Sequence, residues 1–223
     1  MVFIAKTIED YAAEQDIEKI LESRAKARTL LNEIKAVIKP GIKESKAYSL
    51  TEEIYKKHNV TKSWHKPYIR FGENTLLTYA DRAEEDLVLK EEDIAFIDIG
   101  PIFGDIEADL GETLVFGNNK IHQELKQASK ELFKEGDNFY KDKNPSGSEM
   151  YDFLVEKTKS YGFEFNLGNC GHLIGLFSHS ACYKDGMRYF TEKMQPGIWI
   201  LEIQIRHPEI KAGAFFEDIL LQN

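Results

Sequence analysis

Two pairs of acidic residues stand inside short apolar segments, and they constrain the fold of this 223-residue chain more than any other feature. Asp98 and Asp109 lie in FIDIGPIFGDIEADLGETLVF, at residues 96–116. Glu202 and Glu217 lie in IWILEIQIRHPEIKAGAFFEDILL, at residues 198–221. Carboxylates within apolar strands repel one another and lose hydration unless a cation holds them. The sequence therefore predicts that the four acids surround bound cations.

One histidine between the two pairs, His172, lies in a Gly-His-x-x-Gly motif that runs from Gly171 to Gly175. A lone histidine is more often structural than ligating. Beside four carboxylates, however, an imidazole completes a five-ligand set suited to two divalent metals. Two close divalent ions activate water and polarise a carbonyl, so a metal-assisted hydrolase is the leading hypothesis.

Alternation along the strands supports a shared site. Successive side chains point to opposite faces of a strand, so Asp98 shares a face with Gly100, and Asp109 shares one with Gly111. The alternative, acids on a solvated face, is disfavoured by the Ile, Phe, Leu and Trp residues around them. We expect each acid to point into the site while its apolar neighbours pack on the other side.

A helix–helix–strand order occurs twice along the chain. Apolar spacing predicts long helices at 16–38 and 119–134, and shorter helices at 49–58, with Ser49 or Thr51 as N-cap, and 148–161. Strand-like residues 94–98 and 198–202 match in length and in the closing acid, 104 residues apart. Rough alternation occurs in many α/β chains, but acids at a nearly constant offset favour duplication. We predict an α+β fold with pseudo-twofold halves around a central dimetal site, in a single domain spanning 1–223.

Composition limits the classes of partner. The net charge of −9 disfavours binding to nucleic acid or to an anionic membrane. Two cysteines are too few for a disulfide framework, and no segment is typical of a signal peptide or a bilayer span. We expect a cytoplasmic protein without nucleic-acid or membrane partners. The oligomeric state is left open, and a homodimer is one expectation.

These residues resemble a known family. IDIGPIFGDIEADLGET is similar to the Asp-x-Gly … Asp-x-x-x-Thr segment of the M24 metallopeptidases, GHLIG to their histidine motif, and LEIQI and FFEDIL to their two glutamate strands. The family includes methionine aminopeptidases, Xaa-Pro aminopeptidases and prolidases, and has the duplicated pita-bread fold. The resemblance covers the chain from the first long helix, and suggests a short form without the N-terminal domain of many Xaa-Pro enzymes.

The resemblance also implies roles for individual residues. Asp98 would chelate one metal, His172 and Glu202 the other, and Asp109 and Glu217 would bridge both. The cofactors implied are two divalent ions, Mn, Co, Fe or Zn, and the substrate is a short peptide, attacked by a hydroxide that bridges the metals.

Two residues are expected to act in catalysis. Glu202 resembles the proton shuttle of the family. His179, seven residues after His172, occupies the position that steadies the substrate carbonyl and the tetrahedral oxyanion. A loop histidine bonded to backbone is the alternative for His179.

Several positions depart from the family pattern. An arginine after the second aspartate is replaced by Glu112, which alternation turns away from the metals. The upstream family histidine falls on Tyr79 or Asp81, and the prolidase-like arginine before the last glutamate is Phe215, with Arg206 as a substitute to consider.

Two further residues receive a structural assignment. His65 lies near the missing histidine in sequence, and its substitution for that histidine is one alternative, but an ordinary surface role is expected for it. Cys170 is expected to be a small buried residue rather than a nucleophile.

The function expected from these features is a dimetal exopeptidase that removes the N-terminal residue of short peptides, closer to Xaa-Pro peptidases than to methionine aminopeptidases. The alternatives are a methionine aminopeptidase-like enzyme, another small-amide hydrolase or a lyase on the same scaffold, and a non-catalytic binding module.

Overall fold

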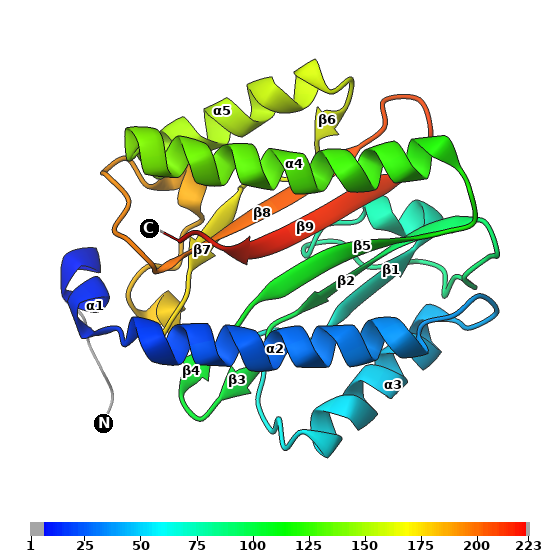
Figure 1. Ribbon diagram of the computed structural model, residues 1–223, viewed down its shortest axis with the longest axis horizontal. Helices are drawn as coiled ribbons and strands as arrows, with labels where there is room; N and C mark the ends of the chain where they lie inside the picture. Colours follow the sequence, from blue (N-terminus) through cyan, green and yellow to red (C-terminus); the bar gives the residue numbers. More distant parts are fainter. Residues whose placement is uncertain (1–6, 222–223) are drawn as a thin grey trace.

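The computed structural model describes residues 7–221, in which a central antiparallel sheet carries helices along one face (Figure 1). The seven-stranded sheet has a six-strand path, and β7 (Gly171–Leu173) pairs with β8 beside it. The order along the path is β1 (Tyr68–Phe71), β2 (Asp93–Ile99), β5 (Leu110–Phe116), β9 (Gly213–Ile219), β8 (Trp199–Arg206) and β6 (Glu164–Phe165). A separate pair joins β3 (Ile102–Phe103) to β4 (Ile106–Glu107).

The strand order is mirrored about the β5–β9 contact. In the first half, α2 (Ile17–Val37) and α3 (Glu44–Lys57) precede β1, β2 and β5. In the second, α4 (Lys120–Lys143) and α5 (Gly147–Ser160) precede β6, β8 and β9. The remaining helical segments are α1 (Ile8–Glu14) and three 3-10 turns, η1 (Gly72–Leu76), η2 (His179–Ala181) and η3 (Met187–Tyr189). The predicted α+β fold with duplicated halves is confirmed.

Local sequence explains three of the helix starts. Asp16 caps α2 by accepting from the Lys19 N–H, and Asn119 caps α4 in the same way. Ser146 and Glu149 form a capping box at the start of α5. Each of these helices begins within a residue or two of its predicted start.

The predicted start of α3 is wrong. The helix begins at Glu44 after Lys43, which makes no side-chain cap. The hydroxyls of Ser49 and Thr51 donate instead to carbonyls one turn back, those of Ser45 and Ala47. Hydroxyl residues inside a helix can bond in this way, so their presence did not mark the N-terminus.

The two long helices pack on the same face of the sheet. On β9, the Phe216 ring meets Phe133 of α4 at 5.0 Å between centroids, and Asp218 pairs with Arg24 of α2. Residues two apart on a strand share a face, so Phe215 and Glu217 point to the opposite one. Each half has its own buried core, one around α2, α3 and β2, the other around α4, α5 and β8.

The register places the acids side by side on that opposite face. Asp98 lies across from Gly111, Gly111 from Glu217, and Glu217 from Glu202. Gly111 has a steric reason: a Cβ there would lie 2.2 Å from Cε1 of the Phe215 ring. Among residues 7–221, no helix is both long enough and apolar enough to span a bilayer.

Candidate metal centre

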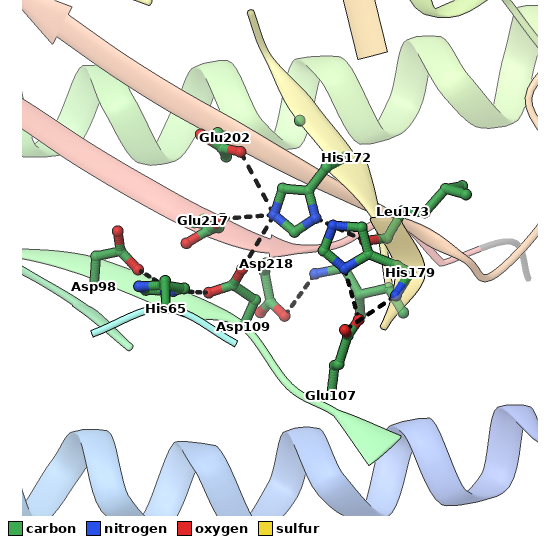
Figure 2. Close-up of polar contacts among 12 residues, drawn as sticks. His65, Asp98, Glu107, Asp109, His172, Leu173, His179, Glu202, Glu217 and Asp218 are labelled. Atoms are coloured by element: carbon green, nitrogen blue, oxygen red, sulfur yellow. Dashed lines mark hydrogen bonds and ion pairs between the residues drawn. The ribbon is translucent and has the colours of Figure 1, made fainter. Parts of the chain in front are cut away.

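Asp109, Glu202 and Glu217 converge on His172, and Asp98 lies beside them at His65 (Figure 2). The Nε2 atom of His172 lies 3.1 Å from Asp109 Oδ2, 3.6 Å from Glu202 Oε1 and 3.8 Å from Glu217 Oε1. Nδ1 of the same ring donates to the Leu173 carbonyl at 2.7 Å, since a carbonyl can only accept. That bond leaves Nε2 as the ring nitrogen that faces the acids.

His65 lies in the same cluster, so the surface role predicted for it is wrong. Its side chain is 12% exposed, and its Nε2 lies 3.4 Å from both Asp98 Oδ1 and Asp109 Oδ1. The residue comes from the loop between α3 and β1, far in sequence from either aspartate. Gly100 leaves room for the His65 ring, because a Cβ on Gly100 would lie 2.3 Å from it.

Burial leaves several of these groups with shifted protonation. Burial opposes a charged imidazole, but the facing carboxylates outweigh it and raise the pKa of His65 to about 10 and that of His172 to about 9. Burial raises the pKa of Asp98 to about 7, although His65 partly offsets it. Burial and neighbouring acids raise the pKa of Glu217 well above its usual range, and burial raises that of Glu202. Asp109 is also buried, but its bonds with His172 and His65 hold its pKa below the usual value.

The donor set fits divalent cations. Asp98 Oδ1 and Glu217 Oε2 are buried without a hydrogen-bond partner, which is costly for a carboxylate oxygen unless a cation faces it. Two groups of potential ligand atoms lie within 4.8 Å of one another, His65–Asp98–Asp109 and Asp109–His172–Glu217. Asp109 is common to both groups, so its carboxylate lies where a bridging ligand would.

His179 stands next to this centre and is held by an acid that sequence reasoning missed. Its Nδ1 lies 2.8 Å from Glu107 Oε2, and its backbone N–H donates to Glu107 Oε1. Glu107 is fully buried. The sequence did carry a signal for Glu107: it precedes Asp109 by two residues, and residues two apart in an extended segment share a face. With Nδ1 engaged, Nε2 is the ring nitrogen left for a ligand.

The centre opens into a cavity of ≈ 400 Å³. Its described lining includes all six clustered side chains, His179, and a rim of aromatic and polar residues: Trp64, Tyr68, Tyr79, Asn169, Lys184, Asp185 and Tyr189. The Trp64 ring packs against His172 and His179, with centroids 4.6 and 5.1 Å apart. A pocket of this size, with ligand-type groups at one wall, can hold a small molecule or a short peptide end.

Comparison with protein families decides the identity of the chain. Residues 18–222 match the model of metallopeptidase family M24. The chain belongs to metallopeptidase family M24. No curated protein sequence matches it.

Solved structures show that this M24 chain has the pita-bread fold. A prolidase from Pyrococcus horikoshii OT3 aligns with a TM-score of 0.77 and 21% identity, covering 94% of this chain and 60% of its own. A methionine aminopeptidase from Thermotoga maritima aligns at 0.72 and 19%, covering 100% and 96%. An X-Pro aminopeptidase from the same organism aligns at 0.73 and 18%, covering 92% and 58%. The chain thus spans about 60% of the length of the prolidase and of the X-Pro aminopeptidase.

One departure of this M24 chain builds a charged layer on the helix side of the sheet. Glu112 accepts from Arg28 at 2.7 Å and is also bonded by Lys35. Asp218 accepts two bonds from Arg24, at 2.5 and 2.6 Å, and one from Arg28, at 2.8 Å. Glu112 therefore faces away from the candidate metal centre, as alternation predicted, and neutralises cations of α2.

The other departures lie at different places relative to the cavity, and of these residues only Tyr79 is among its described lining residues. Phe215 is 5% exposed and packs on Phe96, so it offers no cation to a ligand. Arg206 pairs with Glu164 at the edge of the sheet and is not among the described lining residues of the cavity, so the suggestion that it replaces the missing arginine is wrong. Tyr79 lies at the rim, and Asp81 is bonded to Thr78 outside the cavity.

Cys170 is fully buried, as expected, and burial raises the pKa of its thiol well above the usual range.

Proposed function

We propose that this protein is a dimetal exopeptidase that removes the N-terminal residue of short peptides, most like an Xaa-Pro aminopeptidase or prolidase. The observation that carries the proposal is the cluster of Asp98, Asp109, His172, Glu202 and Glu217, with two buried carboxylate oxygens that lack hydrogen-bond partners, at the wall of a peptide-sized cavity. Family membership supports the peptidase class. We include in the proposal that residues 1–223 form one catalytic domain.

The ligand set would hold two divalent cations, with Asp98 on one side, His172 and Glu202 on the other, and Asp109 and Glu217 between them. When bound, such ions polarise a carbonyl and acidify a water molecule. Cations compete with protons for Asp98, Glu202 and Glu217, because burial raises the pKa of all three.

In this proposal, Glu202 transfers the proton and His179 binds the substrate carbonyl oxygen. Burial raises the pKa of Glu202, which makes its carboxylate a better proton acceptor. His179 is fixed by Glu107, and when both ring nitrogens carry a proton its Nε2 can donate to the substrate carbonyl oxygen and to the tetrahedral oxyanion. The Trp64 ring packs on both histidines.

The acidic inner wall of the cavity suits the peptide N-terminus. The α-amino group of a peptide can contact the site there, which would bring the first peptide bond of a substrate near His179. Among the described residues that line the cavity, Lys184 is the only lysine or arginine, and it is exposed at the rim. With Phe215 at the prolidase arginine position, a free C-terminal carboxylate should contribute little to recognition.

The activity is tested by release of N-terminal residues from a panel of short peptides, including Xaa-Pro and Met-Ala sequences, by protein loaded with Mn²⁺, Co²⁺, Fe²⁺ or Zn²⁺. Metal content is measured on the same samples. Asp109→Asn and His172→Ala should lose metal and activity together. His179→Ala should keep its metal but lose turnover by about a hundredfold or more, the scale of losing one oxyanion donor. Absence of release by fully loaded protein across the panel would overturn the proposal.

The substrate preference is tested by comparing an Xaa-Pro dipeptide with a C-terminally amidated tripeptide that begins with the same residues. A hydrogen bond from the protein to the free carboxylate would be worth roughly 1.5–3 kcal/mol, which is more than tenfold in kcat/KM. Because we expect no such bond here, the two kcat/KM values should lie within about tenfold of one another. The control is Lys184→Ala, which should leave this ratio unchanged. A strong preference for the dipeptide that disappears in Lys184→Ala would show that the rim lysine binds the carboxylate.

A further inference from the structure

His65 contacts two of the acids, yet it lies outside the five-residue ligand set. Its Nε2 lies 3.4 Å from Asp98 Oδ1 and 3.4 Å from Asp109 Oδ1. Asp109 therefore has one imidazole beside each oxygen, His65 at Oδ1 and His172 at Oδ2 (Figure 2). This is the arrangement expected of a bridging carboxylate between two ions that each carry one histidine.

The two rings are oriented by the same local device. Nδ1 of His65 donates to the carbonyl of the next residue, Lys66, at 2.7 Å, and Nδ1 of His172 donates to that of Leu173 at 2.7 Å. A histidine that ligates a metal usually donates its other ring N–H to a carbonyl or carboxylate, which fixes the tautomer and directs the lone pair at the ion. Both imidazoles are thus prepared for coordination through Nε2.

Backbone hydrogen bonds hold the segment that carries His65. Its segment pairs with the residues after β2: the Trp64 N–H donates to the Gly100 carbonyl at 3.0 Å, and the Ile102 N–H to the Lys62 carbonyl at 3.0 Å. A Cβ on Gly100 would lie 2.4 Å from His65 Nε2 and 2.5 Å from Trp64 Nε1. Only a glycine at this position leaves room for the ring to reach Asp98.

We propose that His65 is a sixth metal ligand, which completes the coordination of the ion held by Asp98 and Asp109. The inference rests on the proposed dimetal function and adds a residue to it. Each of the two ions then has one imidazole. The added nitrogen donor moves this position away from an all-oxygen site, so it should favour Co²⁺, Fe²⁺ or Zn²⁺ over Mn²⁺.

The test is cobalt titration of the full-length protein, followed by visible absorption and by proton NMR of the loaded state. Imidazoles bound to Co²⁺ give strongly shifted, exchangeable N–H signals. We expect two such signals in the wild type, one from each Nδ1–H, and two Co²⁺ per chain. His65→Ala should lose one signal and weaken one Co²⁺ site by at least about tenfold, since even residues that only support a ligand typically cost 10–100-fold. His65→Gln serves as a second variant that retains more of the side-chain volume.

His122→Ala is the matched control, because this histidine lies in α4 and is not among the described lining residues of the cavity. It should keep both signals and both sites. The wild type alone also provides a test, through X-ray absorption: one imidazole per cobalt is expected, whereas a ligand set without His65 gives one per two. Two bound Co²⁺ ions with a single shifted signal would overturn the role of His65 and leave the dimetal proposal standing. A wild type that binds no cobalt would overturn the dimetal proposal itself.

Discussion

Replacing Asp218 with asparagine removes one negative charge from the layer behind the metal centre while preserving side-chain shape. Asp218 follows Glu217 on β9 and points to α2, where it accepts three bonds from Arg24 and Arg28. Its side chain is 6% exposed, whereas the two arginines are 36% and 29% exposed. The substitution leaves two guanidinium groups against a neutral amide.

The expected loss follows from these contacts. Removing one partner of a fully buried ion pair costs about 3–5 kcal/mol, because the remaining charge is left uncompensated. The arginines here are partly hydrated, and exposed pairs are worth only about 0–1 kcal/mol, so the value is discounted to about 2 kcal/mol. Since Asp218 adjoins Glu217, we also expect weaker metal binding in Asp218→Asn.

Urea unfolding of chelator-treated protein measures this loss. With a slope of roughly 2 kcal/mol/M, the midpoint should fall by about 1 M. Glu131→Gln is the control, because Glu131 pairs with Lys134 on the exposed face of α4 and should change stability by less than about 0.5 kcal/mol. If Asp218→Asn destabilises no more than this control, the charged layer does not hold the central strands together.

Three further results are expected. The protein should bind about two divalent ions per chain, and chelation should lower its melting temperature because the metal-free acids repel one another. Unchanged stability in chelator, together with no bound metal under any loading condition, would contradict the dimetal assignment. In metal-free protein, the pKa of His65 (about 10) and that of His172 (about 9) lie above the ordinary 6.5. The stability that these two histidines contribute is therefore complete below about pH 6.5 and is lost as the pH rises through 9–10. The melting temperature should fall between about pH 6.5 and 9.5, and a melting temperature that stays constant over this range would refute the argument. Glu107→Gln should lower kcat about tenfold with metal content unchanged, because it replaces a charged partner of His179 with a neutral one. An unaltered kcat would show that Glu107 does not position the His179 ring.

The parts of the fold that sequence predicted are those governed by local chemistry. Apolar spacing located α2, α5 and the start of α4, although α4 runs on to Lys143 instead of ending at 134, and alternation turned Glu112 away from the acids. The start of α3 was not predicted, because Ser49 and Thr51 bond within the helix instead of capping it. The short strands β1 and β6 were missed as well, since four and two residues carry too little pattern to recognise.

The site shows the same division. Motifs on strands found Asp98, Asp109, Glu202 and Glu217, because strand neighbours in register fix where such residues meet. His65 could not be placed from sequence, since the path of the loop before β1 is set by its contacts with Gly100 and Ile102.

Where the two halves of the sheet meet, the register gives only two residue pairs, Gly111 with Glu217 and Glu112 with Phe216. The clustered side chains come from both sides of this seam: His65, Asp98 and Asp109 from one half, and His172, Glu202 and Glu217 from the other. A cation bound among them would act as a cross-link between the halves, so its binding free energy is also energy that keeps the seam closed. Metal release and opening of the middle of the sheet are then one coupled equilibrium, and amide exchange in β5 and β9 should report on it as directly as a metal assay does.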